Sequence, residues 1–237
     1  MEMMSENERL QQAIKESVEK QTLYLEAENV EIPESNASKC RTLVFKQAEA
    51  LKLHPDMQGM EKRYVCLTLH LRRILAAVWY MEAQHRRSLL CRCSTLYPCL
   101  DIDKMWQEFY TPHRRAGNPL YNDDCLYTPG VIVFKSDLSF PERMEEKDWY
   151  QVDVLTCAAP NLRNAPSNFM NPCAGDEPAD IAEDALYKLH LKRIEKLFRV
   201  AAANKAEVLI LGAFGCGAFC NPPEIVAKAF REVQKKI

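Results

Sequence analysis

The second half of the chain alternates between short apolar runs and longer amphipathic segments. Val152–Ala159 and Glu207–Leu211 are almost continuously apolar, which predicts strands buried on both faces of a sheet. Apolar residues spaced three and four apart predict helices over Ile181–Asn204 and from Pro223 to about Lys236. This alternation predicts an α/β fold class, with a central sheet covered by helices and ligands bound outside the strand ends.

The hydrophobic patterns before the second half of the chain are weaker. A short helix is predicted over Ile102–Tyr110 and is expected to stop at Pro112, because proline lacks the amide hydrogen that a helix interior needs. The other predictions are a strand from Tyr64 to Leu67, a turn region over Cys91–Leu100, and two short strands, Cys125–Thr128 and Val131–Phe134, around Pro129 and Gly130.

The start of the chain is charged and has helical spacing. We predict one helix over Glu6–Glu28 and, after a polar break, a second from about Lys39 to Lys52. The chain is accordingly divided into an N-terminal helical extension, residues 1–38, and an α/β domain, residues 39–237.

Composition and charge narrow the class of protein. Hydrophobic residues make up 47% of the chain and charged residues 27%, values typical of a soluble globular protein. The formal net charge of -2 argues against a nucleic-acid partner. No apolar run is long enough to cross a bilayer and the N-terminus has no signal-peptide core, so we expect no membrane partner and a cytoplasmic monomer. Ten scattered cysteines predict neither a disulfide framework nor a metal site, and no cofactor is expected.

The stretch LILGAFGCGAFCN, Leu209–Asn221, holds three of the seven glycines of the chain. It reads as a strand, a glycine loop and the start of a helix, a geometry that presents backbone N–H groups to an anion such as a phosphate. A tight strand-to-helix turn without a ligand is the alternative interpretation of the glycines alone.

Three stretches together resemble one family. They are NPLYNDDCLYTPGVIVFKSD (Asn118–Asp137), VDVLTCAAPNLR (Val152–Arg163) and LILGAFGCGAFCNPPEIVAKAF (Leu209–Phe230), and they are similar to the microbial-type poly(ADP-ribose) glycohydrolases, a branch of the macrodomains. The resemblance implies a macrodomain-like three-layer sandwich with a central mixed sheet, and hydrolysis of ribosyl O-glycosidic bonds. Members of this family usually continue past the last helix into another strand, so a truncated C-terminus is expected.

The resemblance also implies a ligand, ADP-ribose or an ADP-ribosylated protein, and the residues that hold it. The glycine loop would wrap the diphosphate and the distal ribose, with Phe219 against that ribose, unless Phe219 is only a core residue. Asn161 matches a family asparagine near the ligand, unless it only forms a turn. The complete predicted set is Gly212, Gly215, Cys216, Gly217, Ala218, Phe219, Asn221 and Asn161, of which Gly215, Cys216, Gly217 and Ala218 would supply backbone donors.

The catalytic signature of the family should lie within Thr68–Leu90. It consists of three glycines followed by Gln-Glu-Glu, but here Ala76, Ala77 and Val78 stand at the glycines and Arg86, Arg87 and Ser88 stand at Gln-Glu-Glu. Glycosidic cleavage needs a carboxyl group to protonate the leaving oxygen and activate water, whereas arginine stays protonated. The sequence therefore predicts an inactive chain, either a non-catalytic ADP-ribose-binding module or a non-functional pseudoenzyme.

The departure from the family follows a pattern in the genetic code. Codons can be chosen for Thr68–Ser88 whose neighbouring frame reads Asn-Phe-Ala-Ser-Ala-Thr-Asn-Pro, then three glycines and, later, Gln-Glu-Glu at the family positions. We hypothesise that Thr68 to about Leu89 is an out-of-frame translation between two compensating frameshifts. A chance match, made by the freedom of back-translation, is the alternative.

Overall fold

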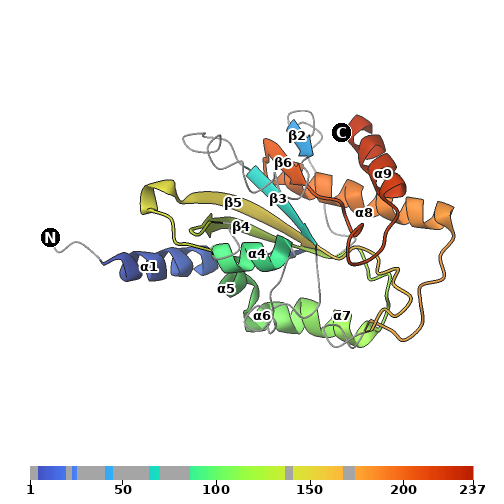
Figure 1. Ribbon diagram of the computed structural model, residues 1–237, viewed down its shortest axis with the longest axis horizontal. Coiled ribbons are helices and arrows are strands. Elements are labelled where there is room, and N and C mark those ends of the chain that lie inside the picture. The colour runs from blue at the N-terminus through green and yellow to red at the C-terminus, as the bar shows by residue number, and fades with distance from the viewer. Residues whose placement is uncertain are drawn as a thin grey trace.

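Six strands form one mixed sheet in the computed structural model, which describes residues 5–19, 23–25, 41–44, 64–69, 86–136, 141–167 and 174–236 (Figure 1). The sheet order is β1-β4-β5-β3-β6-β2, in which β5, β3, β6 and β2 run parallel, while β4 is antiparallel to both β1 and β5. The strands are β1 (Leu23–Leu25), β2 (Arg41–Val44), β3 (Tyr64–Leu69), β4 (Cys125–Val133), β5 (Tyr150–Cys157) and β6 (Val208–Leu211).

Helices cover both faces of this sheet. The long helices α8 (Glu183–Ala203) and α9 (Pro223–Lys236) lie on one face, and a group of shorter helices lies on the other (Figure 1). The remaining helices are α1 (Glu6–Glu19), α4 (Arg86–Cys93), α5 (Leu96–Leu100), α6 (Asp103–Met105), a π-helix (Trp106–Tyr110), α7 (Thr111–Ala116) and a 3-10 turn (Glu146–Asp148).

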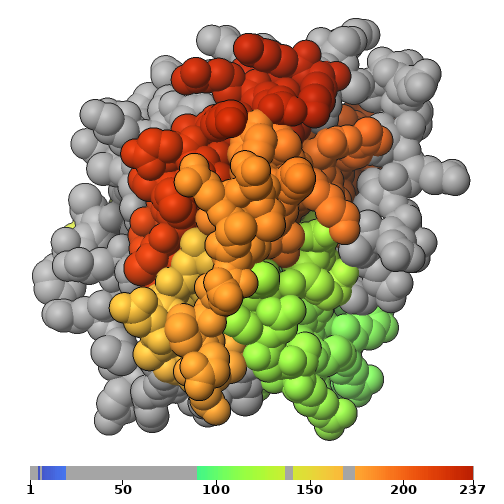
Figure 2. All heavy atoms as spheres, turned by 90° about the vertical axis from the view of Figure 1, so that its right-hand side faces the viewer, coloured from blue at the N-terminus to red at the C-terminus, as the bar shows by residue number. Residues whose placement is uncertain are grey.

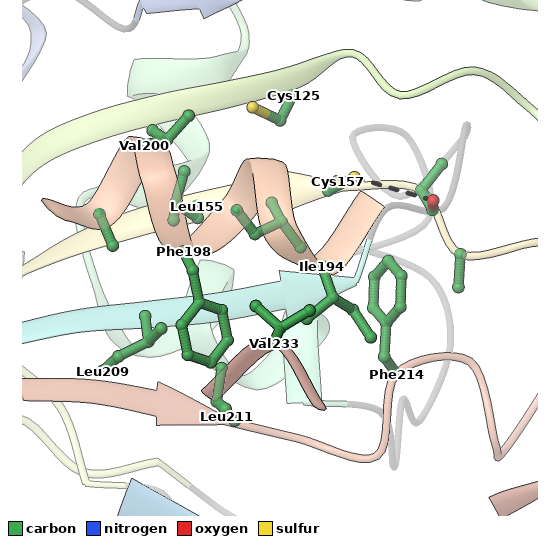
Figure 3. Packing of buried hydrophobic residues seen from close by; sticks show 14 of the residues in the cluster. Cys125, Leu155, Cys157, Ile194, Phe198, Val200, Leu209, Leu211, Phe214 and Val233 are labelled. Carbon is green, nitrogen blue, oxygen red and sulfur yellow. Dashed lines mark hydrogen bonds between the residues drawn. The ribbon is translucent and has the colours of Figure 1, made fainter. Parts of the chain in front are cut away.

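Side chains along the central strands alternate between two buried clusters. Leu155, Leu209 and Leu211 pack with residues of α8 and α9, such as Ile194 and Val233 (Figure 3). Their strand neighbours, among them Val154, Val208 and Ile210, pack on the opposite face with residues of α4, α5, α6 and the π-helix. Because successive strand side chains point to opposite faces, a nearly continuous apolar run buries both. The predicted three-layer α/β sandwich with a central mixed sheet is confirmed.

Two predictions near the N-terminus are wrong. The helix predicted over Glu6–Glu28 ends at Glu19, and Leu23–Leu25 form β1, which pairs antiparallel with β4. Within the helix predicted over Lys39–Lys52, Arg41–Val44 form β2, and the other positions lie outside the described residues. Both strands take their hydrogen bonds from partners distant in the sequence, and such pairing overrides local helical spacing.

Pro112 does not end the helix that precedes it. The chain widens into the π-helix Trp106–Tyr110, where the Thr111 N–H donates to the Trp106 carbonyl, and continues as α7 to Ala116. The wider turn accommodates a residue that lacks an N–H group. Two further predictions are corrected: Cys91–Leu100 contains the end of α4 and all of α5 rather than a turn region, and one bulged strand, β4, replaces the two short strands.

The other strand and helix predictions are confirmed with small shifts at their ends. In the part of the chain that the structure describes, no helix is both long and apolar enough to span a membrane. The domain boundary after residue 38, the monomeric state and the cytoplasmic location stay predictions.

Candidate functional site

The candidate site is formed by two loops at the carboxyl edge of the parallel strands. One loop follows β5 and the other, the glycine loop Gly212–Asn221, follows β6. The Leu162 N–H donates to the Phe219 carbonyl at 3.0 Å, and Arg163 Nε donates to the Ala218 carbonyl. Figure 2 shows the loop after β5 in yellow-orange beside the red C-terminal segment that contains the glycine loop. These bonds make the two loops one surface.

Gly215 combines a left-handed backbone conformation with surroundings that leave little room for a side chain. Its φ is +76°, and an added Cβ would lie 2.4 Å from Asn221 Nδ2 and 2.7 Å from the Cβ of Ala159. Gly217 is different, because an added Cβ there would have no heavy atom within 4 Å. Gly215 is therefore required for the loop to pack against the end of β5, whereas Gly217 lies in open space at the surface.

Backbone donors of the glycine loop divide into two groups. The N–H groups of Cys216 and Asn221 donate within the loop, to the carbonyls of Ala213 at 3.2 Å and of Gly215 at 3.0 Å. Within the described part of the chain, the N–H groups of Gly215, Gly217 and Ala218 meet no acceptor. Three of the four predicted donors thus have no described acceptor; of these, Gly217 is exposed, Ala218 is half-buried and Gly215 is buried. Their contact with an anion stays a prediction.

Asn221 fixes the shape of this loop from inside the protein. It is only 1% exposed, and its Nδ2 donates to the carbonyls of Pro160, Gly215 and Phe219 at 2.7, 3.1 and 3.3 Å. With Nδ2 donating to carbonyls, Oδ1 is the acceptor for His190 Nε2 at 2.9 Å, so the proton of His190 resides on Nε2. Asn221 acts here as a positioning residue, and its direct contact with a ligand stays a prediction.

Neutral His190 supports Asn221 and makes the loop sensitive to acid. Burial lowers the pKa of His190 below its ordinary value of 6.5, and nearby Arg193 lowers it further, against the hydrogen bond to Asn221. We expect the stability that depends on neutral His190 to be fully present above about pH 6.5. It should fall as the pH drops from there through the pKa that His190 has in the folded protein. Thermal denaturation of the chain and of His190→Gln between pH 7 and 5 measures this, because glutamine keeps a donor but does not titrate.

The stability that depends on His113 changes with pH in the opposite direction, so both proteins in that comparison keep His113. Burial lowers the pKa of His113, but hydrogen bonds with Asp124, Phe109 and Asn122 outweigh burial and raise it above its ordinary value. His113 therefore adds stability as the pH falls, in the chain and in His190→Gln alike. If both proteins lose equal stability on acidification, His190 does not cause the loss.

Phe219 lies in the core rather than on an open surface. It is 3% exposed, its ring centroid is 6.0 Å from that of Tyr121, and Arg163 Cζ lies 5.6 Å from the ring centroid. Its core packing is evident, and its contact with a ribose stays a prediction.

Asn161 organises the loop after β5. It is fully buried, its backbone N–H donates to the Pro119 carbonyl at 2.8 Å, and its Nδ2 donates to the Pro166 carbonyl at 3.2 Å. Its Oδ1 also accepts from the Arg163 backbone N–H at 3.4 Å. This is the turn-forming interpretation, and a direct ligand contact stays a prediction.

Arg193 is a supporting residue that the sequence pattern did not reveal. It is 1% exposed and, from α8, its Nη1 donates to the carbonyls of Leu120 and Ala158 at 3.2 and 2.9 Å. Its Nε pairs with Asp123 at 3.0 Å, and Lys192 Nζ lies 2.8 Å from the second oxygen of Asp123. Burial raises the pKa of Asp123, but the two cations outweigh it and the net shift is downward. The adjacent acidic residues Asp123 and Asp124 were the available sequence signal for a buried cationic partner.

The predicted catalytic positions lie mostly outside the described residues. Strand β3 lies between β5 and β6 in the sheet. It ends at Leu69, at the edge of the sheet where both site loops begin. Residues 70–85, which include Ala76–Val78, lie outside the described residues. Arg86, Arg87 and Ser88 belong to the first turn of α4. Among the residues whose positions are described, no group of His, Cys, Asp and Glu is arranged to hold a metal ion.

A mixed sheet between two helical layers, with a glycine loop at the carboxyl edge, defines a macrodomain-like α/β protein. The family model described as the microbial-type PARG catalytic domain matches residues 2–136. The chain therefore belongs to the microbial-type poly(ADP-ribose) glycohydrolase (PARG) family. The matched residues end before the glycine loop.

Solved structures agree with this assignment. The poly(ADP-ribose) glycohydrolase from Thermomonospora curvata bound to the inhibitor ADP-HPD is 26% identical, with a TM-score of 0.70 over 92% of this chain and 74% of that chain. Another structure of that enzyme gives a TM-score of 0.72, with 26% identity, over 92% and 75% of the two chains. The enzyme from Deinococcus radiodurans in complex with ADP-ribose is 22% identical and shares the fold, with a TM-score of 0.68 over 94% and 84%. No curated protein matches significantly.

Proposed function

We propose that this member of the PARG family binds ADP-ribose units through the glycine loop and does not hydrolyse their glycosidic bonds. One observation carries the proposal: Arg86, Arg87 and Ser88 occupy the positions at which the family resemblance expects Gln-Glu-Glu. Between Tyr64 and Leu100 the sequence contains a single carboxylate, Glu82.

The missing pair matters because of the chemistry of the reaction. An oxocarbenium-like transition state needs a proton on the departing oxygen and then a base that activates water, and a carboxyl group serves both steps. A guanidinium keeps its proton near neutral pH and a serine hydroxyl is a poor acid, so neither replaces a glutamate.

Binding is supported by the retained parts of the site. The Gly215, Gly217 and Ala218 N–H groups are held at the strand ends by a buried framework of Asn221 and His190. The similar enzyme from Thermomonospora curvata was solved with ADP-HPD and that from Deinococcus radiodurans with ADP-ribose. We infer that the ligand of this chain is of the same chemical class, free or attached to a protein.

The proposal is tested by measuring hydrolysis and binding on the same protein. Incubation with poly(ADP-ribose) and with an ADP-ribosylated protein is expected to release no ADP-ribose above a blank, because Arg86, Arg87 and Ser88 cannot supply the acid. Calorimetric titration with ADP-ribose is expected to give heat. Absence of heat from a folded protein would favour the non-functional pseudoenzyme instead.

Glu82→Gln is the matched control for hydrolysis. If the unchanged chain does release ADP-ribose and Glu82→Gln does not, then Glu82 supplies the acid and the chain is an active glycohydrolase. If neither protein releases ADP-ribose while both bind it, the proposed binding module is supported.

A further inference from the structure

Arg163 lies where the two loops of the site meet. Its Nε donates to the Ala218 carbonyl, and its Cζ lies 5.6 Å from the centroid of the Phe219 ring. The side chain is half-buried, so the guanidinium is held by the glycine loop and still reaches the surface. Since a cation–π contact and one directed hydrogen bond restrict the orientation of a planar guanidinium, its other donors are restricted in direction as well.

The described residues use only a small part of the hydrogen-bonding capacity of Arg163. A guanidinium has five N–H donors, of which the Nε donor serves Ala218. No described residue accepts a hydrogen bond from Nη1 or Nη2, and no ion pair joins Arg163 to a described carboxylate. The same short stretch of loop that Arg163 contacts carries the available N–H groups of Gly217 and Ala218. Backbone and side-chain donors therefore lie on the same two loops, and no described carboxylate forms an ion pair with Arg163.

We propose that Arg163 is a ligand-binding residue that contacts the diphosphate of an ADP-ribose unit with its Nη donors, beside the Gly217 and Ala218 N–H groups. This inference rests on the proposed function, because it assigns the charge recognition of that same ligand. An arginine fork suits two phosphate oxygens, and a lysine presents only a point charge. Arg163 thus couples the two loops and selects an anionic ligand.

The experiment compares ADP-ribose affinity among Arg163→Gln, Arg163→Lys and a control, Arg231→Gln, which removes one exposed positive charge from α9. A charge-assisted bond to phosphate is expected to give Arg163→Gln about a 10- to 100-fold weaker affinity, and Arg163→Lys a smaller loss. Arg231→Gln is expected to bind like the unchanged chain. The affinity of Arg163→Gln is also expected to depend less on salt concentration, because one contact to phosphate is missing.

Measuring whether the loops keep their structure in the variants shows whether Arg163 binds the ligand or only positions the loops. Amide exchange at Leu162 and Asn221, whose N–H groups donate to loop carbonyls, reports the loop contacts without a ligand. Weaker binding with unchanged exchange and a reduced salt dependence supports the inference. Faster exchange with an unchanged salt dependence, or affinities equal to Arg231→Gln, would overturn it and leave the proposed function standing. An unchanged chain that is folded but binds no ADP-ribose overturns the proposed function, and this inference with it.

Discussion

Restoring glycines at 76–78 and Gln-Glu-Glu at 86–88 is expected to turn a chain that releases no ADP-ribose into one that hydrolyses poly(ADP-ribose). If the family resemblance holds for this segment, the six substitutions supply glycines where the backbone approaches the ligand and a carboxyl group for the departing oxygen. A positioned general acid or base contributes about 10²- to 10⁴-fold in rate, so the difference from the unchanged chain should be large. Release of ADP-ribose from the polymer, followed over time by chromatography, measures it.

Two control proteins identify which change matters. Restoring the glycines alone is expected to improve ADP-ribose binding without turnover, because no acid is supplied. Replacing all of residues 68–89 by their neighbouring-frame translation is expected to give at least the activity of the six substitutions, since β3 includes Thr68 and Leu69 and its end would also be restored. A folded, fully restored chain that stays inactive would show that the family comparison does not transfer to this segment.

The encoding DNA tests the frameshift hypothesis independently of any activity. We expect codons 66–91 to read the family signature in the neighbouring frame. Codons that are incompatible with Gln-Glu-Glu in that frame would end the hypothesis, although the predicted inactivity would remain.

Sequence patterns predict the parts of this fold whose burial is continuous along the chain. Strands β5 and β6 are buried on both faces and α8 carries a long apolar stripe, so local spacing identifies all three. Strands β1 and β2 are different. Leu23–Leu25 and Arg41–Val44 become strands through pairing with β4 and β6. A short stretch of sequence gives no information about a pairing partner so distant in the chain.

The candidate site also has a part that the sequence predicts and a part that it does not. The position of the glycine loop was predictable, because glycines between an apolar strand and a helix start have a local meaning. Its buried support was not predictable, since Asn221 and His190 are separated by 31 residues and are joined by one hydrogen bond. Arg193, 1% exposed, was hidden within an apparently ordinary helix. Buried polar residues are identified by their partners, and those partners exist only in the folded chain.

Binding and hydrolysis rest on different parts of this site. The framework of the glycine loop consists of bonds from Asn221 to His190, to Pro160 in the loop after β5 and to Gly215, and none of these bonds involves Arg86, Arg87 or Ser88. We therefore expect the loop to keep its shape even if the catalytic signature is replaced, as proposed above. A perturbation confined to the loop framework should then abolish binding whatever residues stand at positions 76–78 and 86–88.

Gly215→Ala supplies that perturbation and is expected to destabilise the chain strongly. The new Cβ would lie 2.4 Å from Asn221 Nδ2, which is tied to three carbonyls, and 2.7 Å from Ala159, in a backbone with a φ of +76°. Strain at such a φ and overpacking together cost about 2–5 kcal/mol. Urea denaturation should show this loss, and calorimetry should show no ADP-ribose binding at temperatures where the variant remains folded.

Gly217→Ala is the matched control for this prediction, because it adds the same methyl group to the same loop. No heavy atom lies within 4 Å of its added Cβ, so its free energy of unfolding should stay within about 1 kcal/mol of the unchanged chain. Equal stability losses in the two variants would contradict the packing described for Gly215. A Gly215→Ala protein that binds ADP-ribose normally would show that the loop shape fixed by Asn221 is not what the ligand needs. The two alanine variants therefore test the support of the loop separately from the chemistry that the restored glutamates supply.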